Sequence, residues 1–175
     1  MVNLGDIAIL SNDSVDVNVF DFDNYISTEN MIPNRGGVVF SHDKHPKIGN
    51  TGKIKSYLKN DILISNIRPY FKKIWKSDRD GTRSGDVLSI RPISNKIDIN
   101  YLYVLLQSDN FFEYMMTTSK GTKMPRGDKK AILSYPIKLV NINEQKKIGN
   151  QILMLEKKME MNKKINDNLF CCSLN

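Results

Sequence analysis

The sequence predicts an α+β fold, in which a mixed-sheet domain (residues 1–140) precedes a long C-terminal coiled-coil helix (141–170) and a short tail (171–175). Two observations predict this fold. Up to Pro92, short segments rich in Val, Ile, Tyr and Phe alternate with Gly, Asn, Asp and Pro, which is typical of strands and turns. After Pro92 apolar residues recur at helical spacing, and no proline interrupts residues 141–170.

Seven strands are predicted in the first part of the chain. Proline has no backbone N–H to donate to a ladder, so Pro69 and Pro92 are expected where strands end. Residues with high strand propensity dominate the segments between the turns. The predicted strands cover residues 15–20, 25–31, 37–40, 53–58, 61–67, 72–75 and 86–92.

Two short helices are predicted after the strands, over residues 100–108 and 110–118, because apolar residues recur there every three or four positions. Asn110 and Glu113 have the spacing of a capping box, in which two side chains satisfy free N–H groups at a helix start. We therefore expect Asn110 to cap the second helix.

A long helix is predicted from Asn141, which has the same spacing to Glu144. Apolar positions on it recur at intervals of 4, 3 and 4, the pattern of a coiled-coil seam whose polar members select partner and register. The seam consists of Ile148, Ile152, Leu155, Met159, Asn162, Asn166 and Leu169. We expect this helix to project from the domain and to pair with a partner. The alternative is a helix that packs back along its own domain.

The composition indicates a soluble cytoplasmic protein with one core. Of its 175 residues, 40% are hydrophobic, which is enough for a single folded domain. There is no run of about 18 apolar residues and no signal-peptide pattern, so no membrane segment is expected. Cys171 and Cys172 are adjacent and lack zinc-ligand spacing, and we expect both to be reduced.

Positive charge is concentrated in two segments. Residues 1–30 hold six acidic residues and no Lys or Arg, whereas residues 31–75 carry a net charge of +7 and residues 111–147 of +5. Two basic segments with glycine turns and aromatic neighbours favour a polyanionic partner such as double-stranded DNA. The alternative is an ordinary solvated, lysine-rich surface.

The candidate DNA contacts are residues that can neutralise phosphates or read base edges. They are Arg35, Lys47, Lys53, Asn66, Arg68, Tyr70, Lys72 and Lys73 in the first segment, and Lys120, Thr122, Lys123 and Arg126 in the second. We favour Arg68, which precedes a proline, and Lys123 and Arg126, which flank or form a proline–glycine turn. The second segment is also expected to lie against the root of the long helix.

No catalytic motif is found in the sequence. The segment "SNIRPYF" (65–71) resembles the Asn-Pro-Pro-aromatic motif of amino-methyltransferases, but Arg68 stands before its single proline. Asp128 and Glu156 each precede a lysine pair, which matches half of a nuclease motif, yet a second carboxylate from a neighbouring strand is missing. We therefore expect no cofactor, no metal and no enzymatic activity. The alternative is a metal-dependent nuclease.

Six segments of the chain, taken in their order, carry a resemblance to a known family. They are "VNLGDIAIL" (2–10), "YISTENM" (25–31), "KNDILISNIRPYFKKIW" (59–75), "SGDVLSIRP" (84–92), "FFEYMMTTSKGTKMPRGDKKAILSYPIKL" (111–139) and "NEQKKIGNQIL" (143–153). Their order resembles the DNA-specificity (S) subunits of type I restriction–modification systems. The resemblance covers the chain from residue 1 to about residue 170, with one departure at "LVNINEQ" (139–145), where relatives often carry a proline-rich approach.

This resemblance implies a target recognition domain followed by a structurally shared helix, without catalysis of its own. In the family, methyltransferase (M) subunits carry the cofactor and the chemistry, and restriction (R) subunits can join them. Members normally carry two recognition domains and two helices, whereas this chain has one of each. A homodimer that binds a bipartite target is therefore expected. The alternatives are a fragment of a fused restriction enzyme and a standalone DNA-binding regulator or decoy.

Overall fold

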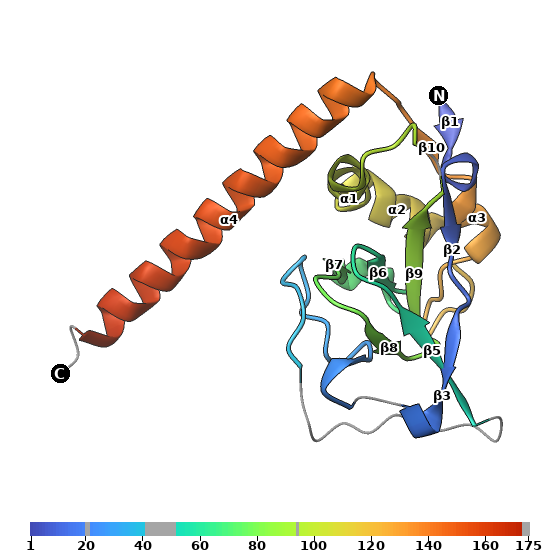
Figure 1. The fold of residues 1–175 in the computed structure, drawn as a ribbon, viewed down its shortest axis with the longest axis horizontal. Coiled ribbons are helices and arrows are strands. Elements are labelled where there is room, and N and C mark those ends of the chain that lie inside the picture. Colours follow the sequence, from blue (N-terminus) through green and yellow to red (C-terminus); the bar gives the residue numbers. More distant parts are fainter. Residues whose placement is uncertain (20–21, 41–51, 94, 173–175) are drawn as a thin grey trace.

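The computed structural model describes residues 1–19, 22–40, 52–93 and 95–172, and it confirms an α+β fold with a long C-terminal helix. Figure 1 shows the sheets and the short helices gathered into one body, from which the long helix α4 (Ile142–Cys172) extends. Within the described residues, no helix is long and apolar enough to span a membrane.

The sheets are built from short strands. The first has the order β2 (Ala8–Leu10), β9 (Val87–Pro92), β6 (Ile62–Ser65), β7 (Ile74–Lys76) and is antiparallel throughout. The second has the order β3 (Ser14–Asp16), β5 (Lys53–Tyr57), β8 (Gly81–Arg83), β4 (Tyr25–Ile26), and only β4 and β8 are parallel. A two-stranded pair joins β1 (Val2–Asn3) to β10 (Pro136–Ile137). The fold also has 3-10 turns at Leu4–Asp6, Val17–Val19, Phe22–Asn24 and Pro69–Phe71.

Strand β6 lies at the centre of the domain because both of its faces are covered. All four of its residues are buried. Side chains alternate along a strand, so Ile62 and Ile64 join the large core on one face. Leu63 joins a smaller cluster with Tyr57 and Trp75 on the other. A continuous apolar run is therefore what this position requires.

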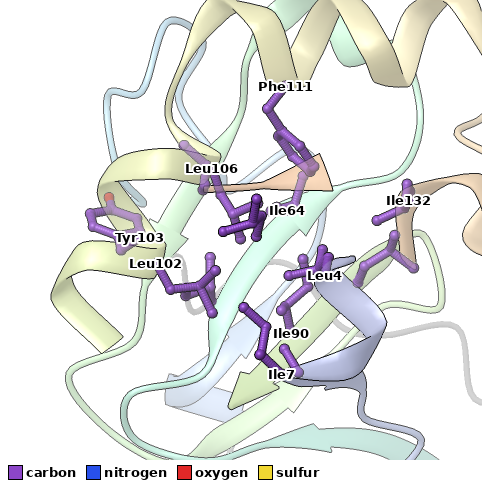
Figure 2. Close-up of a cluster of buried hydrophobic side chains, with 14 of the residues drawn as sticks. Leu4, Ile7, Ile64, Ile90, Leu102, Tyr103, Leu106, Phe111 and Ile132 are labelled. Carbon is purple, nitrogen blue, oxygen red and sulfur yellow. The ribbon is translucent and has the colours of Figure 1, made fainter. Parts of the chain in front are cut away.

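The large core joins the first sheet to the short helices α1 (Ile99–Leu106), α2 (Asp109–Thr117) and α3 (Lys129–Leu133). Each fully buried aliphatic or aromatic side chain in it contributes about 1.5–3 kcal/mol. Figure 2 shows the cluster, in which the labelled residues are Leu4, Ile7, Ile64, Ile90, Leu102, Tyr103, Leu106, Phe111 and Ile132. This core holds the helices on the sheet and so positions the loops between them.

The strand predictions are confirmed in the middle of the domain and are largely wrong at its start. The segments 53–58, 61–67 and 86–92 contain β5, β6 and β9, and the segment 72–75 overlaps β7. By contrast, 25–31 contains the two-residue β4, and a single isolated bridge joins its last residue, Met31, to Val38 in 37–40. The segment 15–20 overlaps only the end of β3 before a 3-10 turn. The unpredicted strands β1, β2, β8 and β10 have two or three residues each, too few for a recognisable alternation.

One predicted helix cap is wrong and another is confirmed. Ser108 caps α2 in place of Asn110, and its hydroxyl accepts a hydrogen bond from the Phe111 N–H at 3.3 Å. The helix therefore starts earlier than the apolar spacing indicated. Asn141 acts as predicted at the start of α4, since its side-chain oxygen accepts from the Glu144 N–H at 2.9 Å.

A buried amide fixes the root of α4. Gln145 is 1% exposed. Its Nε2 donates to the carbonyls of Lys96 and Val140, both at 2.8 Å, and its Oε1 accepts from the Asp98 N–H at 2.9 Å. One side chain thus satisfies three backbone groups, two of them in the turn that leads into α1.

A glycine lets α4 approach α1 closely. A Cβ at position 149 would stand only 2.6 Å from the backbone nitrogen of Tyr101, so Gly149 cannot be replaced without moving the helices. Beside it, the Asn100 amide donates to Asn150 Oδ1 at 2.8 Å. The root of α4 is therefore fixed by α1 and by the turn that leads into it. That the second basic segment also lies against this root stays a prediction.

Only the first part of α4 is covered by its own domain. Ile148 and Leu153 pack partly buried against the large core, so Ile148 is not free for a partner as the seam had suggested. Ile152 is half-buried, whereas Leu155 and Met159 are 60% and 71% exposed. The 31 residues of α4 span about 46 Å, and the outer part projects from the body (Figure 1).

The outer part of α4 carries more exposed apolar residues than the predicted seam. Met154, Met161 and Ile165 are each more than half exposed and recur at intervals of 7 and 4, which adds a second stripe to the helix. Of the polar seam members, Asn162 and Asn166 are exposed. The side chain of Leu169 and residues 173–175 lie outside the described part, and the helix continues to Cys172, two residues into the predicted tail.

Replacing Gln145 with Ala should lower the free energy of unfolding by about 1–3 kcal/mol, because three backbone groups lose a partner in a buried place. Urea unfolding followed by circular dichroism measures the change. Gln151→Ala is the matched control, since Gln151 is exposed on the same helix, and should change stability by less than about 0.5 kcal/mol. Equal effects of the two variants would contradict the role assigned to Gln145.

Candidate nucleic-acid interface

Two loops that are distant in sequence are joined by backbone hydrogen bonds on one side of the domain. The N–H groups of Asn34 and Arg35 donate to the carbonyls of Phe71 and Lys72, at 2.8 and 2.9 Å. The loop at residues 33–36 is thereby fixed against the loop at 66–73. Arg35 and Lys72 become neighbours through these contacts.

A third loop, residues 119–128, is attached to the other end of 66–73. The Arg68 N–H donates to the Pro125 carbonyl at 2.8 Å, and the Gly127 N–H donates to the Asn66 carbonyl at 3.0 Å. Lys120 and Arg126 exchange two backbone hydrogen bonds of 2.9 Å and close the third loop into a small hairpin. The two basic segments of the sequence therefore meet. We call the three loops together the loop surface.

Backbone strain is concentrated in the loop surface. Asn34, Arg35, Arg68 and Lys72 have φ angles of 54°, 63°, 51° and 51°. In the described part of the chain only one further non-glycine residue, Asn60, has a positive φ. This conformation costs about 1–2 kcal/mol per residue with a side chain and persists only where the surroundings impose it. Three of these four strained residues, Arg35, Arg68 and Lys72, are cations.

Asp109, in the first turn of α2, pairs with two of these cations. Its Oδ1 accepts from Lys72 Nζ at 2.7 Å and from the Arg35 guanidinium. The Arg35 Nε also donates to the Gln107 carbonyl at 2.5 Å. The hydrogen bonds from Lys72 and then Arg35 hold the pKa of Asp109 below its usual range, so the carboxylate stays ionised. Sequence reasoning missed Asp109, because only the tertiary fold brings it to these loops.

Two further carboxylates hold cations of the third loop. Asp128 lies 2.6 Å from Lys120 Nζ and also accepts hydrogen bonds from two N–H groups at the start of α3. These contacts, with that of Lys120 the largest, lower the pKa of Asp128 to about 2. Arg126 lies 3.1 Å from Asp86. These pairs orient the cations at the base of the hairpin.

Arg68 and Lys123 are exposed, and neither forms an ion pair with another residue that the structure describes. Thr122 is exposed beside Lys123 at the tip of the hairpin. An unpaired cation on a rigid backbone can attract an anion without first breaking a contact within the protein. These side chains are therefore the most available of the predicted DNA contacts.

An apolar patch adjoins the cations. Tyr70 and Phe71 are 48% and 37% exposed, and their ring centroids lie 4.6 Å apart. Tyr70 and Lys72 also form one wall of a hollow of about 240 Å³, which α2 completes through residues 112–117. Exposed aromatic rings beside cations can contact bases as well as phosphates.

Of the predicted DNA contacts, two are covered or held within the protein, a third lies in the second sheet, and a fourth lies outside the described residues. Asn66 is 7% exposed beneath the hairpin, with its Oδ1 unpartnered among the described residues, so we remove it from the candidate DNA contacts. Lys73 is held to the protein, where its Nζ donates to the Thr28 carbonyl at 2.7 Å. Lys53 opens β5 in the second sheet, and Lys47 lies outside the described residues.

The carboxylates considered for a nuclease are not brought together as a pair. Asp128 is engaged with Lys120 and with the start of α3, while Glu156 lies on α4. Among the described residues, no three His, Cys, Asp or Glu side chains are grouped as metal ligands.

Solved S subunits of type I restriction–modification systems share this fold. The chain is similar to the HsdS subunit from Thermoanaerobacter tengcongensis with a TM-score of 0.71 at 18% identity, over 94% of this chain and 43% of that one. A chain from a structural study of complex assembly and conformational transition in a type I system gives a TM-score of 0.62 at 14% identity, over 93% and 39%. The fold class is thus that of the type I specificity subunits.

The sequence comparison agrees with the fold. Residues 2–169 match the family described as the type I restriction modification DNA specificity domain, and the chain belongs to this family. It is 29% identical over 160 residues to the HindI specificity subunit of Haemophilus influenzae and 26% identical over 107 residues to the EcoDI specificity subunit of Escherichia coli. The resemblance of its segments in the sequence is therefore confirmed.

The chain corresponds to only part of each relative. The matches cover 86% and 61% of this chain but 34% of the HindI subunit and 23% of the EcoDI subunit. The chain thus spans less than half the length of the proteins it resembles.

Backbone strain at Arg68 can be measured by comparing two substitutions there. Arg68→Gly should be more stable than Arg68→Ala by about 1 kcal/mol, because glycine adopts the left-handed conformation without a clash of Cβ. Both variants remove the same exposed guanidinium, so lost contacts cancel in urea unfolding. The same pair of substitutions at Lys123, which has no positive φ, should not favour glycine. A preference for alanine at position 68 would show that the position is unstrained.

Proposed function

We propose that this chain recognises a short element of double-stranded DNA in the cytoplasm, as part of a type I restriction–modification system, and has no catalytic activity of its own. One observation carries the proposal: Arg35, Arg68 and Lys72 are held in strained positions by contacts between loops distant in sequence. Attraction to phosphates needs only charge, whereas reading bases needs fixed positions. Membership of the DNA specificity family supports the same function.

The loop surface divides into residues suited to two kinds of contact. The hairpin carries side chains suited to contacts with DNA phosphates, which accept hydrogen bonds from any flexible donor. These are Lys120, Thr122 and Lys123. Arg68 and Arg126 carry planar forks that can pair with a base edge. Arg68 is the stronger candidate of the two, because Arg126 already has Asp86 as a partner.

The outer part of α4 is proposed to bind partner subunits. Its exposed apolar residues form two neighbouring stripes, a face wider than the seam of a two-stranded coiled coil. A wide face fits a bundle, in which helices of a second copy and of methyltransferase subunits pack together, and restriction subunits join the same complex. The residues concerned are Met154, Leu155, Met159, Met161 and Ile165.

Two copies joined through α4 would present two loop surfaces at a fixed separation. Twofold symmetry is the commonest arrangement of such a pair. Each loop surface would then read the same short element, and the target would be an inverted repeat interrupted by an unread spacer. The length of α4 would set the length of that spacer.

The DNA affinity of the protein should fall steeply with salt, with a slope of about −0.9 for each phosphate contacted. Lys123→Ala should weaken binding equally on all sequences, whereas Arg68→Ala should relax the base preference. Fluorescence anisotropy on a selected and a scrambled duplex measures both effects. Lys157→Ala, which removes an exposed lysine of α4, is the control and should change neither.

An affinity that does not change with salt would contradict phosphate contacts on the loop surface. The same preparation, given magnesium and a methyl donor, should neither cleave nor methylate DNA. Turnover by pure protein that is lost in Asp128→Ala would support the nuclease alternative instead.

The association through α4 should depend on its apolar face. Leu155→Ser and Met159→Ser together should shift the protein from dimer to monomer at micromolar concentration, because each buried side chain contributes about 1.5–3 kcal/mol. Light scattering measures the mass, and Lys157→Ser is the control from the polar side of the helix.

Binding selection on random DNA with the methyltransferase subunit should give an inverted repeat. An asymmetric site, or a monomeric wild type, would rule out self-pairing.

A further inference from the structure

The side chain of Arg35 is held along one edge only. Its Nε donates to the Gln107 carbonyl and its Nη2 to Asp109, so the edge formed by these two nitrogens is engaged within the protein. The remaining nitrogen, Nη1, makes no hydrogen bond with the described residues, and the side chain is 30% exposed. The outer edge, Nη1 with the second N–H of Nη2, therefore remains for a ligand.

The groups that hold Arg35 are themselves rigid. The Gln107 carbonyl lies directly after α1, and Asp109 lies in the first turn of α2. The backbone of Arg35 is fixed as well, because its N–H donates to the Lys72 carbonyl at 2.9 Å and its φ is 63°. The guanidinium is consequently oriented from both ends, by its own main chain and by two helices.

The carboxylate of Asp109 distinguishes reading a base from binding a phosphate. Two cations meet at Asp109, which also accepts from Lys72, and the Glu156 carboxylate of α4 lies close enough to act on Arg35. A carboxylate beside these cations repels phosphates and lowers the net positive charge that the cations could offer them. It is unfavourable for a phosphate clamp but useful for aiming an arginine, whose orientation decides which base edge it can pair with.

We propose that Arg35 reads a guanine through its outer edge, and that Asp109 is the positioning residue that aims it. This inference rests on the proposed function. Guanine presents O6 and N7 in the major groove, two acceptors at the spacing of an arginine fork. Lysine cannot replace the fork, since it is a point charge on a flexible stem.

Binding selection on a randomised duplex, with the methyltransferase subunit present, tests the proposal in the wild type, Arg35→Lys and Asp109→Asn. The wild type should prefer guanine at one position of each half-site by about ten- to a hundred-fold. Both variants should reduce that preference to within a few-fold and leave other positions unchanged. Asp109→Asn should bind mixed-sequence DNA at least as tightly as the wild type, because a negative charge is removed.

Asp78→Asn is the matched control. Asp78 is likewise an exposed carboxylate that pairs with an arginine, Arg79 at 2.8 Å, but it lies outside the loop surface. It should leave the base preference unchanged. In the double variant, Asp109→Asn should reduce the preference no further once Arg35→Lys is present, because a positioning residue acts only through the group it positions.

The possible failures are distinguishable. A wild type without any base preference overturns the proposed function together with this inference. If the wild type has a base preference and Arg35→Lys leaves it intact at every position, only the inference that Arg35 reads a guanine is overturned. If Asp109→Asn weakens binding to all sequences equally, the positioning role is overturned. The same holds if Asp109→Asn reduces the base preference further when Arg35→Lys is already present. Arg35→Lys keeps its charge, so its base preference tests the inference even if Asp109→Asn does not fold.

Discussion

The attachment of α4 through Gln145 is the contact on which the arrangement of the molecule depends. A buried amide that pairs with two carbonyls and one N–H can satisfy all three in only one orientation. Apolar contact alone would tolerate sliding and repacking. Gly149 then brings α4 against the backbone of α1, where a larger residue would not fit. The direction in which α4 leaves the domain is therefore defined by hydrogen bonds and close packing, although most of the helix has no other support.

The features of the fold that depend on local sequence could be predicted, and those that depend on distant contacts could not. The apolar run around Ile62–Ser65 and the proline-free stretch of α4 identify a central strand and a long helix. Short strands such as β8 are created by pairing with neighbours and leave no pattern of their own. Gly149 weakens the helix in isolation, and only its position against α1 explains its presence. Ile148 likewise packs against the large core through contacts with residues distant in sequence, which the seam pattern does not reveal.

The candidate site was predictable as two basic segments but not as a surface. Charge is visible in the sequence, and the two segments do meet. The sequence does not show which side chains are covered, and so Asn66 resembled a base contact although it is buried. Nor does it show strain, since Arg and Lys rarely adopt a positive φ by themselves. Asp109 escapes sequence reasoning because its two partners lie far from it along the chain.

The helix that anchors α4 also holds the loop surface. Arg35 donates to the carbonyl that follows α1, and α1, only eight residues long, rests on α4 at Gly149. A few rigid contacts thus connect the arginine proposed to face DNA with the helix proposed to pair two chains. In such a pair the distance between two loop surfaces is set by helices and not by a flexible linker. Under that constraint, the backbone strain of the loop surface is consistent with contacts that have to stay fixed. A fixed spacing between two domains selects a target only if each contact is equally fixed within its domain, and residues held at positive φ cannot relax toward a neighbouring base.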